Sequence, residues 1–134
     1  MGVKIYLDID GVLLAKDKKV PEHGEAFLSY LVRYHDCYWL TTHCHGGGSN
    51  AVEYLSQYYP DSILEKLDGI KQTDWITLKT EAIDFDSDFV WLDDCPFESE
   101  KNVLKKHNKI NSLIVVNLKR EDELKLIQEK LELA

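Results

Sequence analysis

The chain has 134 residues, 44% of them hydrophobic and 10% aromatic, which suits one domain with a real core. Its 24 acidic residues outnumber 16 basic ones, and the net charge of -8 argues against a nonspecific nucleic-acid binder, which normally has a basic face. No apolar run approaches the roughly 20 residues of a membrane span, and no signal-peptide pattern opens the chain. The three cysteines, Cys37, Cys44 and Cys95, show no CxxC spacing. We therefore expect no membrane segment, no disulfide framework and a cytoplasmic location.

The predicted elements alternate between strands and helices along the whole chain. Short runs rich in β-branched and aromatic residues predict strands, and apolar residues at helical spacing predict helices. Ser49 is a candidate N-cap for the second helix, and Pro60 follows its predicted end. In chain order we predict a strand at 3–9, a helix at 25–34, a strand at 37–40, a helix at 49–59, a strand or helical turn at 63–67, a short helix at 80–84, a strand at 89–92, a helix at 98–107, a strand at 112–118 and a helix at 121–133.

This alternation predicts the fold class. Strands that alternate with helices form βαβ crossovers, and these give a mainly parallel sheet with helices on both faces. We therefore predict an α/β chain with a three-layer α/β/α Rossmann-like architecture, in which residues 1–134 form a single domain. In such sheets the ligand site lies beyond the carboxyl ends of the strands.

Polar residues follow three of the predicted strands at that edge. The first strand runs into Asp8-Ile9-Asp10-Gly11, the second into Thr41-Thr42-His43, and the third into Asp93-Asp94. Up to four carboxylates would then converge, and they would repel one another strongly without a divalent cation. Oxygen ligands of this kind suit Mg²⁺, which keeps an open face for a phosphate.

These residues resemble the motifs of the haloacid dehalogenase (HAD) superfamily of phosphohydrolases. The matching stretches are Asp8-Ile9-Asp10-Gly11-Val12-Leu13, the apolar strand ending in Thr41, Lys79 before a short helix, and Trp91-Leu92-Asp93-Asp94. They occur in the order found in the family and span residues 4–94. The resemblance implies a HAD-like fold and a magnesium-dependent phosphomonoester hydrolase that works through an aspartyl-phosphate.

The resemblance also implies a role for each matching residue. Asp8 would be the nucleophile, and Asp10 the general acid and base. The metal ligands would be Asp8, the main-chain carbonyl of Asp10, and Asp93, with Asp94 either binding through water or bracing the other ligands. Backbone N–H groups after Asp8 would bind phosphoryl oxygens, where Gly11 allows a sharp turn. The side chains that would contact the phosphoryl group are Thr41 and Lys79, and Thr42 could offer its N–H.

Several assignments stay open at the level of sequence. Thr42 competes with Thr41 and Lys71 with Lys79 for the phosphate. The stretch 43–48 contains two histidines, a cysteine and three glycines. Its spacing fits no common zinc pattern, so no zinc is expected; it either flanks the pocket, with a histidine selecting the substrate, or leads into the next helix. Trp75 is a candidate for lining the entrance, and the basic run 16–19 forms an exposed tip or a flap that attracts a charged substrate.

The spacing of the motifs bears on the substrate. Neither the gap between Asp10 and Thr41 nor that between Thr42 and Lys79 can hold a cap domain, so the resemblance is to the small capless branch. An open site suits a phosphorylated small molecule, a nucleotide or a macromolecule end, and a neighbouring subunit of an oligomer could enclose a small substrate. Two other functions fit the same residues: a noncatalytic module that binds a phosphorylated ligand, and a phosphotransferase.

Overall fold

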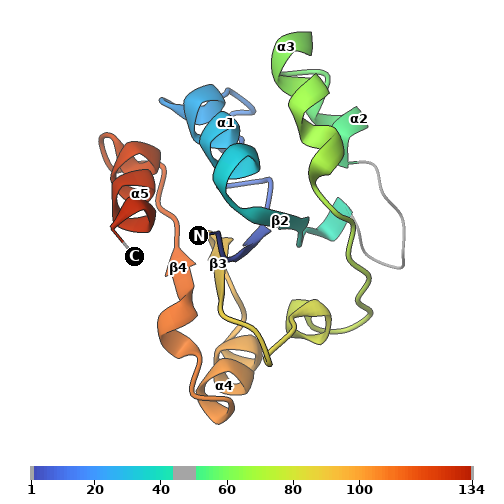
Figure 1. Cartoon of the computed structure of the whole chain (residues 1–134), viewed down its shortest axis with the longest axis vertical. Helices are drawn as coiled ribbons and strands as arrows, with labels where there is room; N and C mark the ends of the chain where they lie inside the picture. The colour runs from blue at the N-terminus through green and yellow to red at the C-terminus, as the bar shows by residue number, and fades with distance from the viewer. Residues whose placement is uncertain (1, 44–50, 134) are drawn as a thin grey trace.

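The computed structural model describes residues 2–43 and 51–133, and its centre is a parallel four-stranded sheet (Figure 1). The strands are β1 (Lys4–Leu7), β2 (Asp36–Trp39), β3 (Phe89–Asp93) and β4 (Leu113–Val115). Their order in the sheet is β2-β1-β3-β4, with every neighbouring pair parallel. The chain therefore leaves β1 toward one side for β2 and returns to its other side for β3, which makes the β1/β3 boundary the topological switch point.

Helices cover both faces of this sheet (Figure 1). The α-helices are α1 (Gly24–Tyr34), α2 (Ala51–Leu55), α3 (Asp61–Leu64), α4 (Glu98–Lys106) and α5 (Glu123–Glu132). The 3₁₀ helices are η2 (Glu65–Gly69), η3 (Lys79–Ala82) and η4 (Ile110–Ser112). Helix α1 contacts α5, β2 and η2, whereas α4 contacts η3 and η4. The predicted α/β class and three-layer Rossmann-like arrangement are thus confirmed.

Side-chain alternation along the strands builds two separate cores. In β1, Ile5 and Leu7 join the larger core, which includes Phe27 of α1 and Leu124 of α5, whereas Tyr6 points to the smaller one. The same alternation continues in β2 and β3, because successive side chains of a strand face opposite sides. The smaller core comprises Tyr6, Leu40, Trp75, Ile83, Phe89, Trp91 and Leu104. Burial on both faces explains why these strands are apolar almost throughout.

Most predicted elements are present, with changes at their ends. The strand predicted at 112–118 is limited to β4, because the chain turns away after it, where Asn117 donates its N–H to Glu123 at 2.7 Å. The ambiguous stretch 63–67 is helical, in α3 and η2. Helix α2 covers part of the helix predicted at 49–59, whose first two residues lie outside the described part. Trp75 is only 8% exposed, which corrects the idea that it lines an entrance.

Within the described ranges, 2–43 and 51–133, no helix is long and apolar enough to cross a membrane.

Candidate functional site

Three carboxylates meet at the carboxyl edge of the sheet, at the switch point between β1 and β3. Asp8 follows β1, Asp93 ends β3 and Asp94 comes next, and each places one carboxylate oxygen within 4.8 Å of the other two. Asp8 and Asp93 are only 7% and 1% exposed. The Asp8 N–H donates to Leu92 O at 3.0 Å, so the sheet itself fixes the end of β1 beside β3. The structure therefore brings together these three predicted residues.

Lys79 supplies the positive charge closest to these carboxylates. Its Nζ lies 2.7 Å from Asp93 Oδ2 and 3.4 Å from Asp8 Oδ2, and its side chain is 12% exposed. Burial alone would lower the pKa of Lys79, but Asp8 and Asp93 raise it overall, so the ammonium stays charged. Lys71, the competing candidate, instead lies 2.9 Å from Asp36 Oδ1 at the first residue of β2. The structure thus places Lys79 beside the carboxylates and Lys71 at the opposite edge of the sheet.

Two glutamates hold the segment that carries Lys79. Glu100 of α4 is 2% exposed, and its carboxylate accepts the Lys79 N–H at 2.7 Å and the Phe97 N–H at 2.8 Å. Glu81 accepts three N–H groups from the residues just before Lys79, at 2.8 to 3.2 Å. Glu100 was not among the predicted site residues. Its position three residues after Phe97, the N-cap residue of α4, is a helix-capping signal, but nothing local shows that it also reaches Lys79.

The electrostatics of this cluster favour a bound cation. Burial and the neighbouring Asp93 raise the pKa of Asp8 to about 7, although Lys79 acts in the opposite direction. Burial and Asp93 also raise the pKa of Asp94. One ammonium thus faces three carboxylates, and a divalent cation would relieve the repulsion that remains. Carboxylate oxygens are hard ligands that suit Mg²⁺, so the donor set fits the predicted metal.

Gly11 gives Asp94 its place beside the turn that follows Asp8. The φ angle of Gly11 is +84°, a conformation that residues with a Cβ rarely adopt. A Cβ at this position would also overlap the Asp94 carboxylate. The Gly11 N–H donates to Leu14 O at 2.7 Å, so in this conformation it is engaged within the turn. Gly11 therefore contributes space next to the carboxylate cluster.

Asp10 belongs to a different set of contacts. Its carboxylate accepts hydrogen bonds from Lys18 at 3.1 Å and Tyr54 at 3.0 Å, and lies 3.2 Å from His43 Nε2. Burial alone would raise the pKa of Asp10, but these three partners outweigh it and lower the pKa. The rings of His43 and Tyr54 stack with their centroids 4.0 Å apart. Within the described residues, the acidic group around Asp8 does not include Asp10.

The two threonines after β2 occupy different environments. Thr41 is fully buried, its Oγ1 accepts the His43 N–H at 3.3 Å, and its carbonyl accepts the Trp75 indole N–H at 3.3 Å. Thr42 is exposed. Thr41 is therefore fixed at the strand end, whereas Thr42 faces solvent. Cys44, His45 and the glycines of the 43–48 stretch lie outside the described residues, so the interpretations of that loop stay predictions.

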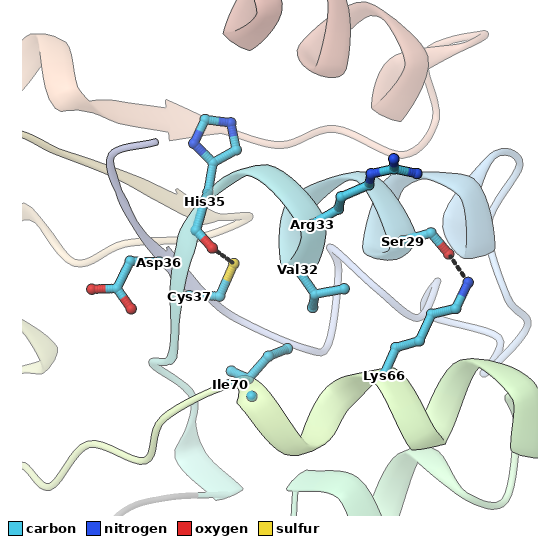
Figure 2. Close-up of a pocket in the computed structure, with 9 residues that line it drawn as sticks. Ser29, Val32, Arg33, His35, Asp36, Cys37, Lys66 and Ile70 are labelled. Carbon is cyan, nitrogen blue, oxygen red and sulfur yellow. Dashed lines mark hydrogen bonds between the residues drawn. The ribbon is translucent and has the colours of Figure 1, made fainter. Parts of the chain in front are cut away.

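Two cavities differ in their relation to the carboxylates. One, of about 660 Å³, borders the cluster through Gly11 and Asp94, and its other walls are residues 15–17 and 115–120. The second, of about 440 Å³, lies between α1, the start of β2 and η2 (Figure 2). There Lys66 donates to Ser29 at 3.3 Å across the opening. The cavity that borders the acidic cluster is the candidate substrate site.

Comparisons of this chain with protein-family models, with curated proteins and with solved structures found no match.

Proposed function

We propose that the protein is a magnesium-dependent phosphomonoester hydrolase of the HAD type, acting through an aspartyl-phosphate. The observation that carries this proposal is the geometry around Asp8. A buried carboxylate at the switch point of a parallel sheet contacts Lys79 and lies within 4.8 Å of two further carboxylates. A purely structural site gains nothing from such a group, because buried like charges destabilise the fold. A nucleophile beside a metal site needs this arrangement.

The first chemical step would be attack by Asp8. One of its carboxylate oxygens forms a bond to phosphorus while the bond from phosphorus to the leaving oxygen breaks. The negative charge that develops on the phosphoryl oxygens would be met by the Lys79 ammonium and the Thr41 hydroxyl. Mg²⁺ held by Asp8, Asp93 and the Asp10 carbonyl, with Asp94 either binding through water or bracing the other ligands, would supply further neutralisation of that charge.

Asp10 would manage the proton in both steps. It gives a proton to the leaving oxygen and later accepts one from the water that attacks the aspartyl-phosphate. The lowered pKa of Asp10 suits the second role, since the carboxylate is ionised near neutral pH. The first role requires that substrate displace a donor such as Lys18, because losing that contact raises the pKa of the carboxyl.

The test measures phosphate release from an aryl phosphate with and without Mg²⁺. We expect Mg²⁺-dependent turnover that Asp8→Asn lowers by at least about 1,000-fold, with an unchanged circular dichroism spectrum. Asp10→Asn should lower kcat by roughly 100-fold, since general acid–base catalysis contributes about that much or more. Asp84→Asn is the control, because Asp84 pairs with Lys4 at the opposite edge of the sheet. The control should keep the activity of the wild type.

Three other outcomes separate this proposal from the alternatives. Absence of Mg²⁺-dependent release across a broad panel of phosphomonoesters contradicts it. Tight phosphate binding without turnover supports a noncatalytic module instead. Phosphoryl transfer to added alcohols or nucleosides, at the expense of free phosphate, identifies a phosphotransferase.

A further inference from the structure

We propose that the cavity beside the carboxylate cluster binds a leaving group that is organic and carries a second anionic group, such as another phosphate. This inference rests on the proposed hydrolase function and names the substrate class of that site. The cavity, of about 660 Å³, lies between residues 15–17, which follow the Gly11 turn, and residues 115–120, which join β4 to α5. Gly11 and Asp94 also line this cavity, and a carboxylate oxygen of Asp94 lies within 4.8 Å of one of Asp8, so a leaving group attached to a phosphoryl group at Asp8 can extend into this space.

The outer walls of the cavity carry a local excess of positive charge. Lys16 and Asp17 come from one wall, and Lys119 and Arg120 come from the other, where Arg120 also lies 3.9 Å from the Glu123 carboxylate. The chain as a whole, in contrast, has a net charge of -8. Such a wall favours an anion at a distance from the reacting phosphoryl group.

The wall that carries Lys119 and Arg120 is held in shape by backbone contacts. The Val116 N–H donates to Asp93 O at 2.9 Å, which ties the loop to the strand that ends in the acidic cluster. The buried carboxylate of Glu123 accepts the Asn117 N–H at 2.7 Å. Asn117 in turn accepts N–H groups from Lys119 and Arg120, each at 3.1 Å. A loop fixed in this way holds the backbone of Lys119 and Arg120 in place relative to Asp93, so less backbone entropy is lost on binding.

The same wall also offers apolar surface. Val115 is 46% exposed although it belongs to β4, and Leu118 is partly buried beside it. Ligand sites typically combine apolar walls with a few polar groups that fix orientation. A substrate with an organic body between two anionic groups matches these surfaces, because the body would contact the apolar side chains while the second anion contacts the basic ones. Inorganic pyrophosphate, which has no organic body, does not.

The kinetic test compares two esters that differ only in a para phosphonomethyl group, which carries the distal anion: phenyl phosphate and 4-(phosphonomethyl)phenyl phosphate. The phosphonate cannot be hydrolysed, so both esters react at one phosphoryl group. We expect kcat/KM to be at least about 10-fold higher for the ester with the phosphonate, through a lower KM. The double substitution Lys119→Ala/Arg120→Ala should bring this ratio close to one. Lys105→Ala/Lys106→Ala removes the same charge from the exposed end of α4 and should leave the ratio at its wild-type value.

A binding titration separates this inference from the hydrolase proposal. Benzylphosphonate is titrated into the wild type and into Lys119→Ala/Arg120→Ala, with heat as the readout. At least about 5-fold weaker binding by the double variant supports the cavity, even if no ester is hydrolysed and the hydrolase proposal fails. Equal ester ratios in wild type and variant, or equal binding of benzylphosphonate, overturn the cavity inference. Hydrolysis of both esters at equal kcat/KM overturns it as well and leaves the hydrolase proposal standing.

Discussion

The two edges of the parallel sheet use charged residues in opposite ways. At the amino edge, Lys4 pairs with Asp84 at 2.7 Å and Lys71 with Asp36 at 2.9 Å. Each ammonium there has one carboxylate, and all four side chains are at least 26% exposed. At the carboxyl edge, Lys79 is 12% exposed and shares two buried carboxylates. The amino edge is balanced and solvated, whereas the carboxyl edge is neither.

This difference bears on stability and on function. Exposed ion pairs contribute about 0–1 kcal/mol to the free energy of unfolding, so the pairs of the amino edge add little to the stability of the fold. The cavity at that edge is likewise lined by solvated polar groups, such as Lys66 bonded to Ser29 (Figure 2). At the carboxyl edge the pKa of Asp8 is raised to about 7, which means that its charged form is destabilised there. A fold that keeps such a group needs a reason other than stability.

The largest effect in this comparison is expected from removing the ammonium at the carboxyl edge. Lys79→Met should lower kcat/KM for an aryl phosphate by roughly 100- to 1,000-fold, because the phosphoryl group loses its closest fixed cation. Lys71→Met, the matched change at the amino edge, should stay within about twofold of the wild type, since Lys71 pairs with an exposed carboxylate. Steady-state kinetics at saturating Mg²⁺ measure both. Equal losses in the two variants would erase the contrast between the edges.

A smaller effect is expected from Glu100, which positions Lys79 through the backbone. Glu100→Gln can accept only one of the two N–H groups, from Lys79 and Phe97, that the carboxylate accepts. We expect a loss of about 1–3 kcal/mol in unfolding free energy and a fall in kcat of roughly 10-fold. The control is Glu98→Gln, an exposed residue of the same helix turn.

The kinetic readout for Glu100→Gln is taken well below the unfolding temperature, so that lost stability alone cannot lower it. A positioning role predicts that kcat falls more than KM rises, because a displaced Lys79 ammonium stabilises the transition state less. A variant that is less stable but keeps the kcat of the wild type would limit Glu100 to capping α4.

Much of the fold could be predicted because its signals are local. Apolar strands such as residues 3–9, followed by helices with one apolar face, determine a parallel sheet with two covered faces. The meeting of Asp8 with Asp93 followed from the rule that parallel strands end at the same edge. The resemblance favoured Lys79 over Lys71, but no local pattern could settle that choice, because it depends on which lysine the folded chain brings back to the site.

The contacts of Asp10 show where sequence reasoning reaches its limit. Lys18 and Tyr54 are separated from Asp10 by 8 and 44 positions, and no local pattern joins them. Their approach depends on how the turn after Gly11 and helix α2 pack, which is a property of the tertiary structure. The length of β4 was also overestimated, since SLIVVNL is mostly apolar and rich in β-branched residues, whereas the loop after Val115 is fixed by Glu123 of the next helix.

The smallest effect is one on stability, and its sign distinguishes the two edges. In metal-free protein the raised pKa of Asp8 means that the folded state holds this proton more tightly than the unfolded chain. The stability from this group is fully present below the unfolded pKa of 3.8 and is lost as the pH rises through about 7. Asp8→Asn removes that loss. In EDTA at pH 8 its free energy of unfolding should therefore be about 1–2 kcal/mol higher than that of the wild type, with a smaller difference at pH 5.

Asp36→Asn gives the opposite expectation, because bonding to Lys71 lowers the pKa of Asp36, and its stabilising charge is present above the unfolded pKa. This variant should therefore gain nothing at pH 8. Thermal unfolding in EDTA at the two pH values, with a shift of about 3–8 °C expected for Asp8→Asn at pH 8, measures both. Added Mg²⁺ should narrow the gap between wild type and Asp8→Asn, because a cation that binds only the folded wild type stabilises it. If Asp8→Asn were the less stable protein at pH 8 without metal, the Asp8 carboxylate would be a structural group like those of the amino edge.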